Sequence, residues 1–191
     1  MKTLKRVSAH CALCSVLGLL AGCNVLPEPQ ADTVRYFTLG SPAAAGFATN
    51  GTLVRPVQLA GHLRGRKMAV RVGDHEVIYL EDVRWAESLD EAITQLLRSR
   101  LGPVGGGATV NVQVQRCEVV RSAGNQVELA ATYVIVPADG DKAAAQRGSF
   151  TASPHAWDGK DYGALADLMG AAIGELGDAI ATAIATPAEK K

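Results

Sequence analysis

The chain has 191 residues, of which 48% are hydrophobic and 20% charged, and its 19 basic and 19 acidic side chains balance. This length suits one folded domain, and the balanced charge gives no indication of nucleic-acid binding. Neither a nucleic-acid partner nor a second domain is expected.

Residues 1–23 have the pattern of a bacterial lipoprotein signal. Three basic residues among the first six precede an apolar run over residues 9–20, which is too short to span a bilayer. The run leads into Leu-Ala-Gly-Cys, which matches the lipobox at all four positions. We expect a diacylglycerol group on the Cys23 sulfur and cleavage between Gly22 and Cys23. An ordinary secretory signal with a chance cysteine is the alternative.

The residues that follow Cys23 predict a tether. Residues 24–33 are mostly polar and contain two prolines. Asn24, in place of the Asp that retains lipoproteins in the inner membrane of enteric bacteria, favours the outer membrane. The acyl chains would hold the protein on the lipid, because each buried methylene contributes about 0.8 kcal/mol. The expected organisation is a signal (1–22), a lipidated tether (23–33), one domain (34–187) and a tail (188–191).

The four cysteines do not predict a disulfide framework. Cys11 and Cys14 leave with the signal and Cys23 carries lipid, so Cys117 is the one cysteine of the mature domain. Cys117 lies in an apolar, strand-like segment, which favours a small buried hydrophobic residue over a nucleophile.

Alternating hydrophobic residues predict short strands in the first half of the domain, over residues 34–40, 53–59, 67–73 and 76–81. The sequence Gly73-Asp74-His75 separates the last two and predicts a hairpin. A helix is expected from Ser88 to Leu101, because Ser88 and Glu91 have the spacing of a capping box. Its apolar residues follow one stripe, and Gly102-Pro103 ends it.

The second half follows a glycine-rich connection, residues 105–107, and again alternates strand and helix patterns. Strands are predicted over residues 109–121, 127–136 and 145–153. The strand over 127–136 is apolar on both faces toward its end, so we expect it to be central and covered on both sides.

The chain closes with a predicted helix over residues 161–185. Small residues at positions 170, 174, 177 and 181 are expected to let this helix lie close on the sheet. Its three acidic side chains disfavour a transmembrane position. We predict an α/β (α+β) fold, with a mixed, mainly antiparallel sheet of about five to seven strands and two helices, 88–101 and 161–185.

The mature chain offers no sequence motif for catalysis or metal binding. Its three histidines lack the spacing of metal ligands, and its paired carboxylates are typical of turns and helix starts. These residues are His62, His75 and His155, and the pairs Asp82 with Glu87 and Asp139 with Asp141. We expect neither an enzyme nor a cofactor.

One basic cluster lies between Arg55 and Val72, where no acidic residue occurs. Its members are Arg64, Arg66, Lys67 and Arg71. The cluster predicts either a solvated hairpin face or a contact with an acidic partner or with lipid phosphates.

Several motifs carry a resemblance to a known family. They are Tyr36-Phe37-Thr38-Leu39, Arg55-Pro56-Val57-Gln58-Leu59 followed by His62-Leu63, Val70-Arg71, and Arg84-Trp85-Ala86-Glu87-Ser88-Leu89-Asp90-Glu91. The chain resembles the ABC-type transport auxiliary lipoprotein family, also called paraquat-inducible protein C-like lipoproteins, over nearly the whole mature domain. The segment Arg84-Trp85-Ala86-Glu87 is its most specific part, and we expect Trp85 to pack beneath the first helix.

The resemblance implies a periplasmic, lipid-anchored, non-enzymatic subunit. Such a subunit works beside an ABC transporter and an MCE-type substrate-binding protein, in systems that move lipids between the inner and outer membranes. The implied fold, a mixed sheet with two helices, agrees with the periodicity. The competing class is an envelope-assembly lipoprotein that binds or activates a peptidoglycan or lipopolysaccharide machine. Assembly into a homo-oligomer stays open.

Overall fold

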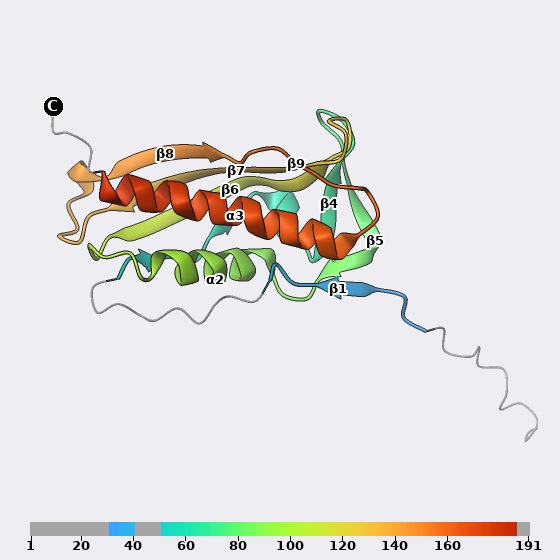
Figure 1. Cartoon of the computed structure of the whole chain (residues 1–191), viewed down its shortest axis with the longest axis horizontal. Coiled ribbons are helices and arrows are strands. Elements are labelled where there is room, and N and C mark those ends of the chain that lie inside the picture. The colour runs from blue at the N-terminus through green and yellow to red at the C-terminus, as the bar shows by residue number, and fades with distance from the viewer. Residues whose placement is uncertain (1–30, 41–50, 187–191) are drawn as a thin grey trace, which may run out of the picture. The chain divides into compact units, whose positions relative to one another are not determined.

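A mixed sheet covered on one face by two α-helices makes up the domain (Figure 1). The computed structural model describes residues 31–40 and 51–186. The described residues from Val34 onward belong to one compact unit. The predicted fold class, a mixed sheet with two helices, is confirmed.

The sheet has nine strands among the described residues, in the order β1-β5-β4-β6-β7-β8, with β2 and β3 beside β6 and β9 beside β7. The number exceeds the predicted five to seven because β2, β3 and β9 have only two residues each. Pairing is parallel for β1 with β5 and for β4 with β6, and antiparallel along β4–β5 and β6–β7–β8. The strands are β1 (Arg35–Phe37), β2 (Leu53–Val54), β3 (Gln58–Leu59), β4 (Lys67–Arg71), β5 (Val77–Trp85), β6 (Thr109–Val120), β7 (Gln126–Val136), β8 (Gln146–Thr151) and β9 (His155–Ala156).

The predicted strand over residues 53–59 is divided into β2 and β3. Between them, Val57 N donates a hydrogen bond to Thr94 Oγ1 at 2.9 Å. Thr94 lies in the first helix, α2 (Leu89–Leu101). The interruption therefore ties this part of the sheet to the helix that packs on it.

The start of α2 is where the capping box predicts it, but the bonding differs. Ser88 is the N-cap residue, yet its hydroxyl donates to Glu91 Oε2 at 2.7 Å and caps no backbone N–H. The prediction that the Ser88 oxygen accepts from a backbone N–H is therefore wrong: the hydroxyl acts as a donor to the charged Glu91 carboxylate, and its oxygen accepts no backbone hydrogen bond. The apolar stripe is buried as predicted, with Leu89, Ile93, Leu97 and Leu101 in the core.

The second helix, α3 (Tyr162–Ala185), begins at Asp161, whose side chain accepts hydrogen bonds from the N–H groups of Gly163 and Ala164. By length and composition alone, α3 is the one helix of the described residues that passes for a membrane span. Its stripe lies instead in the core, as the charge pattern predicts. The buried residues of that stripe include Leu165, Met169, Ile173, Leu176 and Ile180.

The small residues of α3 face neighbours other than the sheet. A Cβ on Gly170 would lie 2.9 Å from the Leu39 carbonyl oxygen, and one on Gly177 would lie 2.8 Å from Arg100 Cδ. The expectation that these positions serve a close approach to the sheet is thus wrong for both glycines. They allow α3 to approach α2 and the segment after β1.

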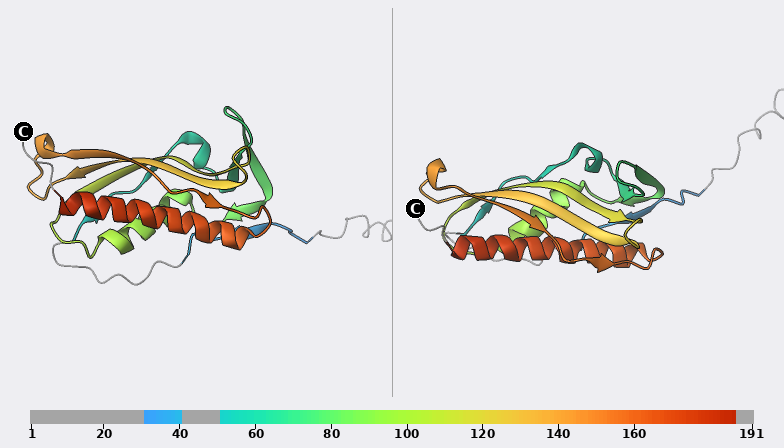
Figure 2. Two further views of the ribbon diagram at one scale, coloured as in Figure 1. Left: turned by 45° about the horizontal axis from the view of Figure 1, so that its top comes forward. Right: turned by 90° about the horizontal axis from the view of Figure 1, so that it is seen from above.

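Among residues 31–40 and 51–186, α-helices cover only one face of the sheet. Figure 2 shows α3 on one side and the short 3₁₀ turn η2 (Gly61–Leu63) on the other. On β7, Leu129 and Ala131 are buried whereas Thr132 between β6 and β8 is exposed. The prediction that this strand is covered on both sides is therefore wrong, because its neighbours are antiparallel and no helix crosses its outer face.

Candidate functional site

The motif Arg84-Trp85-Ala86-Glu87 forms the corner where β5 ends and α2 begins. The Trp85 side chain is only 4% exposed and belongs to the core, as predicted for a structural anchor. Trp85 N donates to Arg66 O at 2.7 Å, and Ala86 N donates to Phe37 O at 2.8 Å. The backbone of this motif thus joins β1 to the chain entering β4.

An aromatic cluster holds β1 against the start of α3. The ring of Phe37 lies 6.1 Å from that of Tyr162, which in turn lies 5.2 Å from Trp157. The guanidinium of Arg35 stands 5.0 Å above the Tyr162 ring, and Trp157 Nε1 donates to Asp161 O at 2.7 Å. The inner side of β1 is therefore anchored by aromatic stacking and a cation–π contact.

The outer side of β1 is different. Tyr36 is paired in register with Arg84 of β5, and Arg84 is paired with Lys67 of β4. Paired residues point to the same face of a sheet, so these three side chains form one row across the outer face. Tyr36 is 51% exposed, and Arg84 Nε is buried without a hydrogen-bond partner among the described residues.

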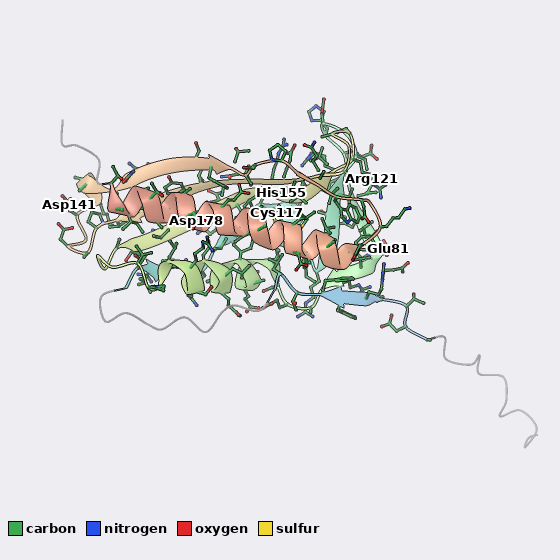
Figure 3. The ribbon with its side chains drawn as sticks, viewed as in Figure 1. Glu81, Cys117, Arg121, Asp141, His155 and Asp178 are labelled. Atoms are coloured by element: carbon green, nitrogen blue, oxygen red, sulfur yellow. The ribbon has the colours of Figure 1, made fainter. Side chains whose placement is uncertain are left out.

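The four members of the predicted basic cluster have different environments. Arg64 and Arg66 are exposed in the turn between η2 and β4, and they make no ion pair in the described part of the chain. Lys67 pairs with Glu81 at 2.7 Å. The proximity of Lys67 lowers the pKa of Glu81 through a hydrogen bond and charge attraction. Figure 3 shows Glu81 at the β5 end of the sheet, opposite the end that carries Asp141.

Arg71 is not exposed. Its side chain is 13% accessible, and its Nε lies 2.6 Å from Oε1 of Glu118, which is fully buried on β6. The second oxygen of Glu118 lies 3.3 Å from Nε2 of His62 on η2, while Tyr79 donates its hydroxyl hydrogen to the His62 carbonyl. The expectation that all four basic residues are exposed is thus wrong for Arg71, because it neutralises a buried carboxylate beneath η2.

Sequence reasoning missed Glu118 and Glu81 as the partners of this cluster. The strand predicted over residues 109–121 contains Glu118, but the local sequence could not indicate that η2 covers that part of the outer face. Long-range pairing of β4 with both β5 and β6 brings these acids to a segment that has none of its own.

The remaining candidate residues occupy structural positions. His155 Nε2 lies 2.8 Å from Glu175 Oε1, and Asp141 caps the short turn η3 (Lys142–Ala144) by accepting from Ala143 N. Burial raises the pKa of the Cys117 thiol to about 12. No group of three or more His, Cys, Asp or Glu suited to a metal ion occurs among residues 31–40 and 51–186. Gly22 and Cys23 lie outside the described residues.

Part of the chain matches the model of a known sequence family. Residues 37–116 match the family model described as the ABC-type transport auxiliary lipoprotein component. The resemblance inferred from the motifs is confirmed over this range, which is shorter than the nearly complete mature domain expected from the sequence. None of the curated proteins compared with the chain matches it.

Two solved structures share the fold. A crystal structure described only as that of an uncharacterized protein superposes with a TM-score of 0.62 at 17% identity, covering 78% of this chain and 97% of that one. The crystal structure of protein XCC0632 from Xanthomonas campestris, assigned to the family DUF330, gives a TM-score of 0.54 at 15% identity, covering 78% and 89%. At these identities the likeness concerns the fold.

Proposed function

We propose that this chain, a member of the ABC-type transport auxiliary lipoprotein family by the match over residues 37–116, is a lipid-anchored periplasmic subunit of an intermembrane lipid-transport system. In this proposal it accompanies an ABC transporter and an MCE-type substrate-binding protein, and it holds their assembly at the outer membrane. It does so without catalysing a reaction.

The family match carries this proposal. The matched range begins in β1 and ends in β6, and it contains the corner motif that joins β1, β4, β5 and α2. The lipobox at Cys23 and Asn24 after it support a lipidated protein sorted to the outer membrane. The basic segment, with Arg64 and Arg66 as its exposed members, is the candidate contact with an acidic partner or with lipid phosphates.

Co-purification tests the partners. The acylated chain, extracted in mild detergent, is expected to bring with it an ATPase, a permease and an MCE-type protein. Recovery of peptidoglycan or lipopolysaccharide assembly proteins in their place would assign the chain to the competing class of envelope lipoproteins.

Substitution of the anchoring residue tests the anchor separately. The Cys23→Ser variant is expected to remain an uncleaved precursor and to take up no labelled fatty acid. Fatty-acid label on that variant, at the level of the parent chain, would contradict lipidation at Cys23. Separation of inner and outer membranes then reports where the parent chain resides, and recovery in the inner membrane would contradict the proposed sorting.

A further inference from the structure

Tyr36 is an aromatic side chain left in solvent at the edge of the sheet. Its neighbour Phe37 stacks on Tyr162, whereas Tyr36 points to the opposite face and is half exposed. Tyr79, also on the outer face, is 42% exposed and gives its hydroxyl hydrogen to His62 O. Packing of the domain explains Phe37 and leaves Tyr36 without a role in the core.

Two basic residues follow Tyr36 in its row across the outer face, and a third lies in the turn that leads into β4. Arg84 is its cross-strand partner, Lys67 is next in the same row, and the backbone of Arg66 bonds to Trp85 beside them. Glu81 neutralises Lys67 and lies within electrostatic range of Arg84, but it pairs only with Lys67. We use the name β1 corner for Tyr36, Lys67 and Arg84 of this row together with Arg64 and Arg66, which are exposed in the turn that leads into β4. Asp82, the residue after Glu81, is a second exposed acid on β5.

The β1 corner is also the part of the domain nearest to the lipidated cysteine along the chain. Eleven residue steps separate Cys23 from Val34, the residue before β1. At about 3.3 Å for each residue, Val34 stays within about 36 Å of Cys23 however the tether is arranged, and Tyr36 follows two residues later. Such a short connection gives weak contacts with the surface a high effective concentration.

We propose that the β1 corner rests on an anionic lipid surface, with Tyr36 at the level of the headgroups and Arg64, Arg66 and Arg84 on their phosphates. Tyrosine is suited to this boundary because one end of its ring is apolar and the other polar. Basic side chains gain from the negative surface potential only within a short distance, which the anchor maintains. The proposal rests on the lipid anchor of the proposed function.

Site-directed labelling of the acylated chain tests the contact. Cys23 carries lipid and Cys117 is buried, so one introduced cysteine reacts alone with a fluorescent thiol reagent. Thr38→Cys places the label just after β1 and leaves Tyr36 in place, and Ser149→Cys places it on β8, at the other edge of the sheet. The labelled chains are reconstituted in phosphatidylglycerol or phosphatidylcholine vesicles that contain headgroup spin labels.

We expect stronger quenching at position 38 than at position 149 in phosphatidylglycerol vesicles. The difference is expected to shrink in phosphatidylcholine and at high salt, and to fall on Tyr36→Ala. Arg66→Gln removes one charge and is expected to lower the ratio of contacting to free corners about fivefold. Arg147→Gln, the same change on the exposed surface of β8, is the matched control and should leave quenching at position 38 unchanged.

Vesicle flotation separates failure of the anchor from failure of the contact. A chain that does not float contradicts the lipid anchor and with it this proposal. A chain that floats but shows equal quenching at positions 38 and 149 contradicts the contact alone. Quenching that follows protein density and not lipid charge would assign the corner to a second copy of the chain. Burial of the label only after the co-purified subunits are added would assign it to a protein partner.

Discussion

The carbonyl oxygen of Leu39 occupies the space in which a side chain at position 170 would begin. A Cβ on Gly170 would lie 2.9 Å from that oxygen, a distance that real Cβ contacts essentially never show. Leu39 is buried, so its backbone has little room to withdraw. The contact fixes how closely α3 lies beside the segment that follows β1.

Three glycines of α3 therefore predict a graded series. Gly170→Ala meets backbone and should destabilise the domain by about 1–3 kcal/mol, in spite of the higher helix propensity of alanine. Gly177→Ala meets the flexible side chain of Arg100 and should cost less. Gly174→Ala, whose Cβ would be 4.0 Å from Arg100 Nη1, should be neutral or stabilising by up to about 1 kcal/mol. Denaturant unfolding of the three variants measures the order, and equal effects would contradict the contact.

Trp85→Ala should destabilise the domain by about 3–5 kcal/mol, because it empties a buried site in the core. Tyr36→Ala removes an aromatic ring of similar character from the surface and serves as the control. Its effect should stay within about 0.5 kcal/mol. An unchanged denaturant midpoint for Trp85→Ala would show that the indole does not pack as described.

Glu118 and Arg71 should behave as a coupled pair. Removing one partner alone, as in Arg71→Met, leaves a buried carboxylate without its counter-ion and should cost about 3–5 kcal/mol. Replacing both, as in Arg71→Met with Glu118→Leu, should recover much of that loss. A double-mutant cycle from unfolding curves measures the coupling, and strictly additive effects would contradict it.

The contact of Glu175 with Ser153 and His155 predicts sensitivity to acid. A hydrogen bond from Ser153 N, at 2.9 Å, is the largest cause that lowers the pKa of Glu175 from its ordinary value of 4.5. A carboxyl group with a lowered pKa in the folded state stabilises the fold above pH 4.5, and this contribution is lost as the pH falls through the lowered value.

Glu175→Gln should therefore flatten the pH dependence of the unfolding free energy below pH 4.5. The same substitution should lower the unfolding free energy itself at neutral pH. Asp167→Asn is the matched control, since Asp167 is an exposed acid of the same helix with no hydrogen bond or ion pair to the described residues. An identical acid slope in Glu175→Gln and the parent chain would exclude Glu175 as its source.

The extent to which the sequence predicts the fold follows from the range of the interactions involved. Both helices and the hairpin around Gly73-Asp74-His75 depend on neighbours within a few residues, and all three are found as predicted. Trp85 is buried in the core, as expected for a structural residue, and its packing beneath the first helix stays a prediction. Burial of Glu118 depends on η2, which crosses the outer face of the sheet. His62 of η2, which contacts Glu118, lies 56 residues earlier in the chain. A contact between residues so far apart in the chain leaves no recognisable pattern in the local sequence around either residue.

The basic cluster shows the same limit at the candidate site. Residue spacing correctly brings Arg64 and Arg66 to the surface, but it treats Lys67 and Arg71 as equivalent to them. Because β4 lies between β5 and β6, Lys67 pairs with Glu81 of β5 and Arg71 pairs with Glu118 of β6. Both side chains therefore form ion pairs within the domain. Tyr36 became a candidate only when the structure showed which side of β1 faces solvent.

The short pairing of β1 with β5 affects how the domain responds to a pulling force. A load applied between a lipid-held cysteine and the rest of the domain enters through the chain before Arg35, and it meets a strand of three residues first. That strand is held by its ladder to β5 and by the stacking of Phe37 on Tyr162, both outside the long ladder of β6 and β7. Because β1 has only three paired positions, we expect it to detach from β5 before the long ladder of β6 and β7 yields, which would lengthen the tether and leave the main sheet intact.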